Sequence, residues 1–441
     1  MFQFDPLGLI MAGFIAFMWG VVFAFSRRYM DGDRFEGAYY AHLCGLLAAL
    51  MALVFADHVA VFAVAWIATG TILARLIGHH HDWAEARAAR KLTFGIFAIG
   101  QACVVAALAL ISSQTGLTQI SAITGQISEQ GINTAVEPVF FLAGLLLIIG
   151  ALVQSALVPF QGWLLNSMTA PTPVSALMHA GLVNAGGFLI LRFSGLFSTL
   201  PELLVFLFFT GAVSALAGSL WMLVQSDVKR VLACSTVAQM GFMILQCGLG
   251  FYTAALAHLI LHGCFKAYHF LNAGSALDGV RIPDRGANID GTQPMSAPVK
   301  SQITKSQIVS CLFALAGAGV TALLFAQFTE KSLIAMDTGL VLVAFVAIAG
   351  AMAASHMAGW HHFSLPVRGI GALAVLVLAT GLYAVIFNGI SAALGIDSPQ
   401  PLSLMHFGAL GLFPVGWASV RWGGVFNRPG IYLYIQRGAA P

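Results

Sequence analysis

The organisation of the chain follows from residues 227–275, which read DVKRVLACSTVAQMGFMILQCGLGFYTAALAHLILHGCFKAYHFLNAGS. The second half is apolar enough for a bilayer, yet four polar side chains recur in it at offsets of four, four and three: His258, His262, Lys266 and His269. These offsets place them on one face of a helix, as a stripe about 16 Å long. A lysine inside a membrane costs several kcal/mol unless it faces protein or water, and it usually marks an ion path. The alternative is a lysine that snorkels to the interface or pairs in the bundle, but three aligned histidines favour a relay.

The composition excludes a soluble globular protein. Of the 441 residues, 59% are hydrophobic and 8% are charged, and the mean hydropathy is +0.88, as in chains that cross a membrane many times. The net charge of +3 is too small to indicate nucleic-acid binding. The six cysteines form no Cys-x-x-Cys pair, so no disulfide framework is indicated. We predict an all-α polytopic membrane protein, a single bundle over residues 1–441 that is surrounded by membrane lipid.

Apolar runs of about 20 residues predict about 13 membrane spans. They lie at residues 6–26, 38–56, 58–78, 91–112, 139–158, 171–192, 203–224, 230–249, 252–276, 306–327, 337–357, 369–394 and 402–422. The first run has no basic stretch before it and no small-residue cleavage site, so we expect a retained helix rather than a signal peptide.

The basic residues support this count. All lysines and arginines fall on one side of the membrane except Arg192 and Lys331, on the other side, and Lys266, within it. The positive-inside rule then places the N-terminus outside and the C-terminus in the cytoplasm, in a bacterial inner membrane. The longest polar stretch, residues 277–305, becomes a cytoplasmic loop and a candidate docking surface for a partner.

The segment around the fifth span does not read as a simple helix. Residues 150–188 read GALVQSALVPFQGWLLNSMTAPTPVSALMHAGLVNAGGF and contain three prolines. Proline breaks a helix, and unpaired backbone at membrane depth is tolerated only where it lines a cavity or is buried in protein. We predict a broken helix near 154–171 and then a helix with His179 and Asn184, as in transport proteins. An ordinary proline kink is the alternative.

These motifs resemble those of a known family. The segments ALVQSALVPFQGWLLNSMTAPTPVSALMHA (151–180), SDVKRVLACSTVAQMGFM (226–243) and HLILHGCFKAYHFLNAGS (258–275) are similar to signatures of the antiporter-like subunits of respiratory complex I and of Mrp cation/proton antiporters. The resemblance implies antiporter-like inverted five-helix repeats, each with a broken helix. The expected parts are a first repeat at 38–192, a degenerate second repeat at 203–357, and C-terminal helices with a cytoplasmic tail at 369–441.

The resemblance also implies an ion path across the membrane midplane. Lys229 matches the family's lysine in the Asp-x-Lys-Arg element that begins at Asp227, and His179 matches the histidine of the PTPVSALxH element. The stripe matches the family's pattern of two histidines and a lysine at intervals of four. The expected ion-translocation residues are Lys229, His258, His262, Lys266, His179, Gln154, Asp227 and His269.

Departures from the family pattern argue against a full cation/proton antiport cycle. The family's glutamate follows a tryptophan in an early helix, whereas Ile67 follows Trp66 here, and the lysine of the first broken helix falls on Gln154. The second broken-helix motif is not found around 306–327. A glutamate–lysine pair lets each group modulate the pKa of the other, so its loss leaves only the central lysine–histidine segment titratable.

One branch of the family is more similar. The elements WIATGTILARL (66–76) and HAGLVNAGGFLILR (179–192) resemble the DabB membrane subunits of DAB-type inorganic carbon transporters. This resemblance implies a DabA-like partner, a large cytoplasmic protein with a carbonic-anhydrase-like zinc site, and an inward flow of protons or sodium ions that drives accumulation of CO2 as bicarbonate. The zinc is expected in the partner, and no cofactor or metal is expected in this chain, which offers no tetrahedral ligand set. A metal role for the run of three histidines at 79–81 stays open, although a solvated loop is favoured.

Two other functions remain as alternatives. The chain could be an antiporter-like, proton-translocating subunit of a complex I, Mrp or membrane-hydrogenase assembly, or a structural membrane anchor with vestigial lysines. The missing glutamate and lysine disfavour the first alternative, and the retained stripe disfavours the second. In every case the chain has no catalytic site of its own, so whether it belongs to an enzyme depends on its partner, and no nucleic acid is involved.

The distribution of charge predicts the topology. We expect reporter fusions at the C-terminus and within 277–305 to be cytoplasmic, and fusions within the basic-free loop 113–138 to be external. Alkaline phosphatase and fluorescent-protein fusions measure this directly, and an external C-terminus would contradict the 13-span arrangement.

Overall fold

The computed structural model describes residues 1–274, 305–329, 337–358, 364–409 and 411. Within these residues every regular element is a helix, apart from three isolated backbone bridges, which confirms the all-α prediction. The described residues form two compact units. The first holds Met1–Leu271, Asp337, Thr338 and the described residues from Phe387 onward, and the second holds the remainder.

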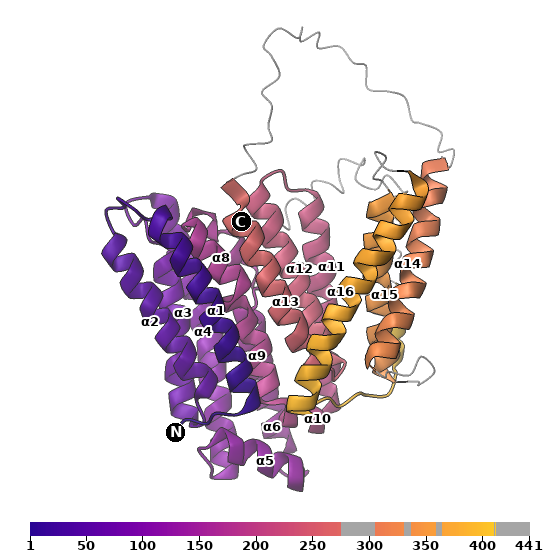
Figure 1. The fold of residues 1–441 in the computed structure, drawn as a ribbon. Helices are drawn as coiled ribbons and strands as arrows, with labels where there is room; N and C mark the ends of the chain where they lie inside the picture. Colours follow the sequence, from indigo (N-terminus) through magenta and orange to yellow (C-terminus); the bar gives the residue numbers. More distant parts are fainter. Residues whose placement is uncertain (275–304, 330–336, 359–363, 410, 412–441) are drawn as a thin grey trace, which may run out of the picture. The chain divides into compact units, whose positions relative to one another are not determined.

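The first unit begins with four long helices, each packed against the next (Figure 1). They are α1 (Pro6–Tyr29), α2 (Glu36–Phe55), α3 (Val59–Ile77) and α4 (Ala84–Thr115). Asp5 starts α1 by accepting a hydrogen bond from the Gly8 N–H at 2.8 Å. Asp5 also pairs with Arg192, whose Nη2 donates to the Val54 carbonyl at 2.5 Å, so one ion pair ties the start of the chain to two later helices.

An interrupted segment follows at the centre of this unit. After α5 (Ile120–Gln130), α6 (Glu137–Gln154) ends before Pro159, and the chain continues as short pieces. These are α7 (Gly162–Leu165), η1 (Ser167–Thr169), α8 (Thr172–Ala180), η2 (Leu182–Asn184) and α9 (Ala185–Arg192). The helix that carries His179 is therefore itself interrupted, a break that the proline pattern did not predict.

The second interruption has a local cause in Asn184. The side-chain Nδ2 of Asn184 donates to the Ala180 carbonyl at 2.7 Å, which in a continuous helix would accept from the backbone N–H of residue 184. That N–H instead donates to Gly181 at 3.1 Å, as in a tighter turn. The span from Thr172 to Arg192 is nonetheless the most buried of the candidate membrane spans, so its irregular backbone lies inside protein, where it is tolerated.

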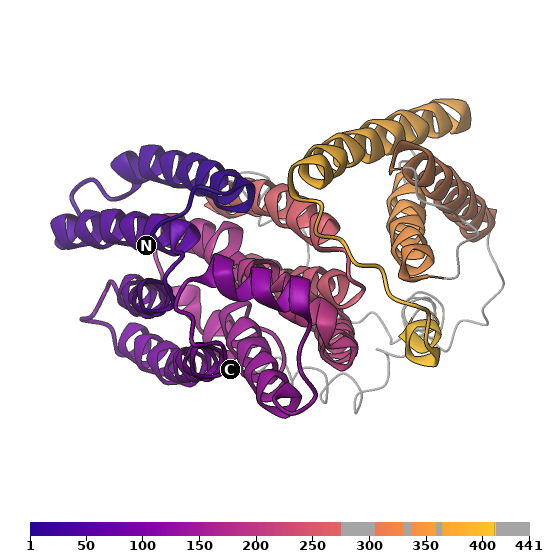
Figure 2. The ribbon, with the colours of Figure 1, turned by 90° about the horizontal axis from the view of Figure 1, so that it is seen from below.

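Three further long helices complete the packing of the first unit. After α10 (Ser194–Thr199) come α11 (Pro201–Leu223), α12 (Val228–Gly248) and α13 (Tyr252–Leu271). In the view from below (Figure 2), α1–α4 lie on one side of this unit and α12 and α13 on the other. The short α8 packs against α1 and α13, so it bridges the two groups of helices.

The contact between α11 and α12 is a seam of glycines. Gly211 and Gly218 on α11, and Gly241 and Gly248 on α12, face the backbone of the opposite helix. A Cβ atom at any of the four would lie within 3.0 Å of that backbone. Small residues let membrane helices approach until their backbones touch, which maximises van der Waals contact where lipid removes the hydrophobic driving force.

The second unit contains three helices. They are α14 (Lys305–Thr329), α15 (Thr338–Ala358), whose first residue belongs to the first unit, and α16 (Leu365–Leu394), which leaves the second unit at Phe387. Gly317 on α14 lies against Gly350 and Ala354 on α15, so small residues again set the helix spacing. After α16 the chain returns to the first unit, where the Ser398 N–H donates to the Gly250 carbonyl at 2.9 Å.

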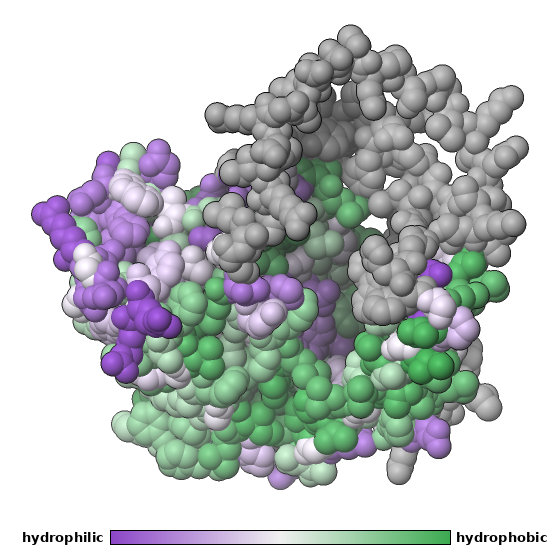
Figure 3. Space-filling model, turned by 45° about the horizontal axis from the view of Figure 1, so that its top comes forward, coloured by the Kyte–Doolittle hydropathy of each residue, from purple (hydrophilic) through white to green (hydrophobic). Residues whose placement is uncertain are grey.

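Eleven described helices are long and apolar enough to cross a membrane. They correspond to predicted spans one to eight and ten to twelve. The ninth span forms α13, whose lysine and histidines lower its mean hydropathy, and the thirteenth span (402–422) lies mostly outside the described residues. The multi-pass prediction is thus confirmed, while the count of 13 is not. Figure 3 shows many apolar residues (green) on the surface, and hydrophilic residues (purple) gathered mainly at the upper left, over the first unit.

Several other predictions fall outside the described residues. These include nearly all of the loop 277–305 and the segment after Arg421, which were expected to dock a partner. The two-repeat arrangement and the orientation of the termini stay predictions.

The glycine seam predicts a specific loss of stability. Gly241→Ala places a methyl group against the backbone of Ala215 and Gly211, and overpacking of this kind typically costs about 1–3 kcal/mol. Gly13→Ala, in α1, is the matched control, because no atom lies within 4 Å of the added Cβ and alanine favours a helix by up to ~1 kcal/mol. Thermal unfolding in detergent should show a lower Tm for Gly241→Ala only; equal Tm values would contradict the seam.

Candidate functional site

The amine of Lys266 lies at the centre of the polar groups in the first unit. The side chain projects from α13 and is 1% exposed. Its Nζ donates to the Leu232 carbonyl at 2.7 Å and to the Ser235 hydroxyl, both on α12. A buried amine is costly to keep charged, and these two oxygens offset part of that cost. The lysine is therefore held between two helices, α12 and α13.

His179 joins the same network through Thr236. The imidazole on α8 is fully buried, its Nδ1 lies 3.0 Å from Thr236 Oγ1, and its ring stacks on Phe270 with centroids 4.2 Å apart. Thr236 donates its single hydroxyl proton to the Leu232 carbonyl at 2.9 Å, so it accepts from His179 Nδ1–H. This assigns the tautomer of neutral His179 and leaves Nε2 without a proton. The Leu232 carbonyl thus links His179 to Lys266 across three helices.

A row of buried nitrogen atoms continues from this network along α13. The Nε2 atoms of His179, His258 and His262 are buried and have no hydrogen-bond partner among the described residues. The rings of His258 and His262 lie 5.7 Å apart, and Lys266 follows His262 by four residues, on the same face of α13. Buried polar atoms are normally paired, with ordered water where protein offers no partner. The row therefore has the chemistry of a hydrated proton or ion path.

The remaining residues of the predicted ion path lie apart from this network. Lys229 is half-buried in the first turn of α12. Asp227 is exposed and caps α12, accepting from the Arg230 N–H at 2.8 Å. His269 is half-buried, and its ring contacts Phe265 and Tyr268. The structure thus brings together Lys266, His262, His258 and His179, and gives Asp227 the geometry of a helix cap.

Gln154 has a backbone partner that the sequence did not predict. Its Nε2 donates to the Leu182 carbonyl at 3.3 Å, and the neighbouring Ser155 hydroxyl donates to the Val183 carbonyl at 2.7 Å. Both carbonyls belong to η2, where the chain leaves helical geometry. Gln154 and Ser155 therefore satisfy the backbone of the interrupted helix.

Sequence reasoning missed the hydroxyl groups around Lys266. Ser235 and Thr236 contact the lysine and His179, and Ser155 supports η2. The available signal was the adjacent Ser-Thr pair in an otherwise apolar helix, because a hydroxyl in a membrane helix is often a hydrogen-bonding contact to a neighbouring helix.

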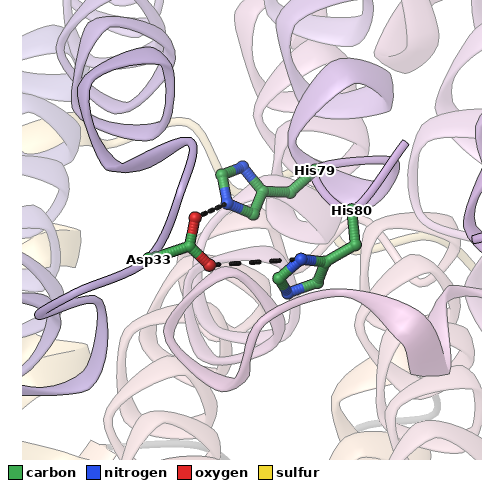
Figure 4. Close-up of side chains that lie close together, drawn as sticks. All are labelled: Asp33, His79 and His80. Carbon is green, nitrogen blue, oxygen red and sulfur yellow. Dashed lines mark hydrogen bonds and ion pairs between the residues drawn. The ribbon is translucent and has the colours of Figure 1, made fainter. Parts of the chain in front are cut away.

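A second polar cluster lies at one end of the first unit, where the α1–α2 connection meets the end of α3 (Figure 4). His79 is buried, and its Nε2 lies 3.1 Å from Asp33 Oδ1, while His80 Nδ1 lies 4.0 Å from Asp33 Oδ2. The expectation of a solvated loop is therefore wrong for His79, because the adjoining connection and the rings of Phe35 and Tyr39 cover it.

The protonation states of this pair follow from its surroundings. Burial alone would raise the pKa of the Asp33 carboxyl, but hydrogen bonds from the Phe35 N–H and from His79 bring it below its ordinary value. Burial lowers the pKa of His79, against the opposing effect of Asp33. At neutral pH the pair is a carboxylate beside a neutral imidazole.

The hydrogen bond from Gln154 to the Leu182 carbonyl predicts that replacing Gln154 lowers the stability of the protein. Gln154→Ala leaves the Leu182 carbonyl buried without a donor, which typically costs about 1–3 kcal/mol. Gln101→Ala is the matched control, because Gln101 Nε2 donates to the Ile67 carbonyl at the same 3.3 Å but on an exposed flank, where a change within about 0.5 kcal/mol is typical. Thermal unfolding in detergent should separate the two variants; a neutral Gln154→Ala would contradict the backbone role.

The sequence of the chain matches known proteins. A family model described as NADH:quinone oxidoreductase/Mrp antiporter, TM, matches residues 56–358. A probable inorganic carbon transporter subunit DabB of Bacillus anthracis is 38% identical over 286 residues, which cover 63% of this chain and 54% of that protein. NADH-quinone oxidoreductase subunit L of Escherichia coli is 33% identical over 277 residues, or 62% and 44% of the two chains. The chain spans about half the length of these relatives.

Solved structures share the fold. A chain of the Mrp complex from Dietzia sp. DQ12-45-1b aligns with a TM-score of 0.60 at 24% identity, covering 99% of this chain and 45% of that one. A chain of the membrane-bound sulfane sulfur reductase, an archaeal respiratory membrane complex, aligns with a TM-score of 0.57 at 18% identity, with coverage of 99% and 84%. Since the family model spans well over half of the chain and includes its buried lysine and histidines, the protein belongs to the NADH:quinone oxidoreductase/Mrp antiporter transmembrane family.

Proposed function

We propose that this chain is the ion-conducting membrane subunit of an inorganic carbon transporter. It conducts protons or sodium ions inward and couples this flow to the accumulation of CO2 as bicarbonate by a DabA-like, zinc-containing cytoplasmic partner. The observation that carries the proposal is the buried Lys266 amine, held by Leu232 and Ser235 beside histidine nitrogens that have no protein partner among the described residues.

The chemistry of this network supports ion transfer. A buried lysine and histidines can pass a proton from one to the next when water joins them. The assigned tautomer of His179 leaves Nε2 ready to accept a proton, while Nδ1–H is held by Thr236. A purely structural network would pair these nitrogens, since orphaned buried groups are destabilising. The network therefore favours a conducting role over that of a membrane anchor.

The choice of inorganic carbon as the coupled substrate rests on similarity. Relatives named as probable inorganic carbon transporter subunits DabB are 35–38% identical to this chain. The absence of an acid after Trp66 and of a lysine at position 154 supports one-way flow coupled to a partner over an antiport cycle. An antiporter-like subunit of a respiratory complex is the second candidate, and the 33% identity to the Escherichia coli subunit L favours it.

Co-expression with the partner tests the coupling. The chain and its DabA-like partner should together restore growth in ambient air to a bacterium that lacks carbonic anhydrase, and neither should do so alone. An uncoupler should abolish bicarbonate accumulation, because the partner's hydration reaction would lose its driving force. Equal accumulation with the gradient collapsed would overturn the coupling, and co-purification with quinone-reducing subunits would favour the second candidate.

Variants of the network test the ion path in the same assay. Lys266→Ala should abolish accumulation while the complex still assembles, whereas Lys91→Ala, on the exposed surface, should match wild type. Thr236→Val removes the link to His179 at nearly constant volume and should slow uptake by roughly tenfold, the effect of one lost hydrogen bond on a transfer barrier. Thr210→Val is its control, because Thr210 bonds only within its own helix. Wild-type uptake by an assembled Lys266→Ala complex would make the lysine structural.

A further inference from the structure

The cluster of Asp33, His79 and His80 lies outside the proposed ion path and is built from metal-binding groups. Each residue offers one ligand atom, and the three atoms lie within 4.8 Å of one another (Figure 4). The carboxylate comes from the α1–α2 connection and the two imidazoles from the end of α3, 46 residues later along the chain. Helix packing therefore creates the cluster, which residue spacing alone could not reveal.

The separations suit a small divalent cation. Zinc binds histidine nitrogen and carboxylate oxygen at about 2.0–2.2 Å in tetrahedral geometry, which places neighbouring ligand atoms about 3.3–3.6 Å apart. His79 Nε2 and Asp33 Oδ1 are 3.1 Å apart, and His80 Nδ1 and Asp33 Oδ2 are 4.0 Å apart. Closing the separations among one Asp33 oxygen and the two imidazole nitrogens, at most 4.8 Å, to this spacing would bring all three onto one ion, with water as the fourth ligand.

Aromatic packing holds the two imidazoles in this arrangement. The ring of His79 meets Tyr39 edge-on with centroids 5.6 Å apart, and the ring of His80 stacks on Trp83 at 4.7 Å. The His79 side chain is 4% exposed and the His80 side chain 29% exposed. The site is thus fixed on one flank and open to solvent on the other, which gives an ion a route of entry.

The charges around the cluster also favour a cation. The carboxyl ends of α1 and α3 both face this region, and the partial negative charge of a helix C-terminus attracts cations. Two arginines that are close to the cluster in sequence are engaged elsewhere: Arg34 pairs with Asp82 at 3.7 Å, and Arg87 donates to the carbonyls of His81 and Asp82. Neither guanidinium neutralises Asp33 through a direct contact.

We propose that Asp33, His79 and His80 bind one divalent transition-metal cation with the preferences of zinc, which fastens the α1–α2 connection to the end of α3. Two imidazoles and one carboxylate select zinc-like ions over calcium or magnesium, which prefer oxygen ligands. The site does not depend on the proposed function, because none of its residues belongs to the ion path.

Metal binding to the purified full chain tests this proposal. The protein should carry no histidine tag, and its accessible cysteines should be alkylated so that thiols do not bind the ion. After chelator treatment, titration with Zn2+ against a chromophoric competitor should give one equivalent, and Co2+ should give the visible d–d absorption of a four-coordinate site. Zn2+ should also raise the Tm, since an ion that binds only the folded state stabilises it.

Variants distinguish zinc binding at this cluster from adventitious zinc binding elsewhere on the protein. His80→Ala and Asp33→Asn should weaken zinc binding at least about tenfold, since even loss of a group behind a ligand costs 10–100-fold, and they should abolish the rise in Tm. His81→Ala is the matched control from the same run of histidines, because its side chain is 53% exposed and outside the cluster. His80 is partly exposed, so its removal leaves the fold intact even if His79→Ala does not. Absence of the cobalt band in wild type, or wild-type affinity in His80→Ala, would overturn the proposal.

Discussion

The Lys266 amine lies in the interior of the bundle, and the surrounding helices must provide it with hydrogen-bond acceptors. An ammonium cannot be left in apolar surroundings without acceptors, and α12 supplies them through the Leu232 carbonyl and the Ser235 hydroxyl. The Leu232 carbonyl then serves two donors, because Thr236 uses it as well. Through Thr236 the same oxygen orients His179 on α8. One backbone carbonyl therefore links the consecutive helices α12 and α13 to α8, which lies about 50 residues earlier in the chain.

In the interrupted helices, too, polar groups that lie away from water are given hydrogen-bond partners. Carbonyls freed where the helix leaves regular geometry are satisfied by Gln154, Ser155 and Asn184. The amide side chains at 154 and 184 thereby replace backbone donors. This explains how a span that is irregular in its middle can also be the most buried of the candidate spans.

Much of the fold could be predicted from the sequence, and the reasons for the remainder are physical. Apolar runs locate most helices because burial in lipid requires length and hydropathy, and the four-residue spacing put His258, His262 and Lys266 together. The break at Gly181 was not predicted, because it depends on a side chain of Asn184 that replaces a backbone donor. Ser235 and Thr236 were missed because a hydroxyl is common in membrane helices and only its neighbour across the interface gives it a role. The sequence suggested a solvated His79 because the residues that cover it, Phe35 and Tyr39, come from the α1–α2 connection and from α2.

The glycine seam has a further consequence for motion. Where two backbones touch without intervening side chains, neither helix can rotate about its own axis, because any turn would drive a Cα or carbonyl into its neighbour. The pair α11–α12 is thus a rigid body, and the Leu232 carbonyl is fixed within it. Conformational change around Lys266 must then come from α13 or from the segmented α8–α9, whose breaks at Gly181 and Asn184 provide hinges. The pair α11–α12 would keep its position while the titratable side chains on the neighbouring helices move relative to it.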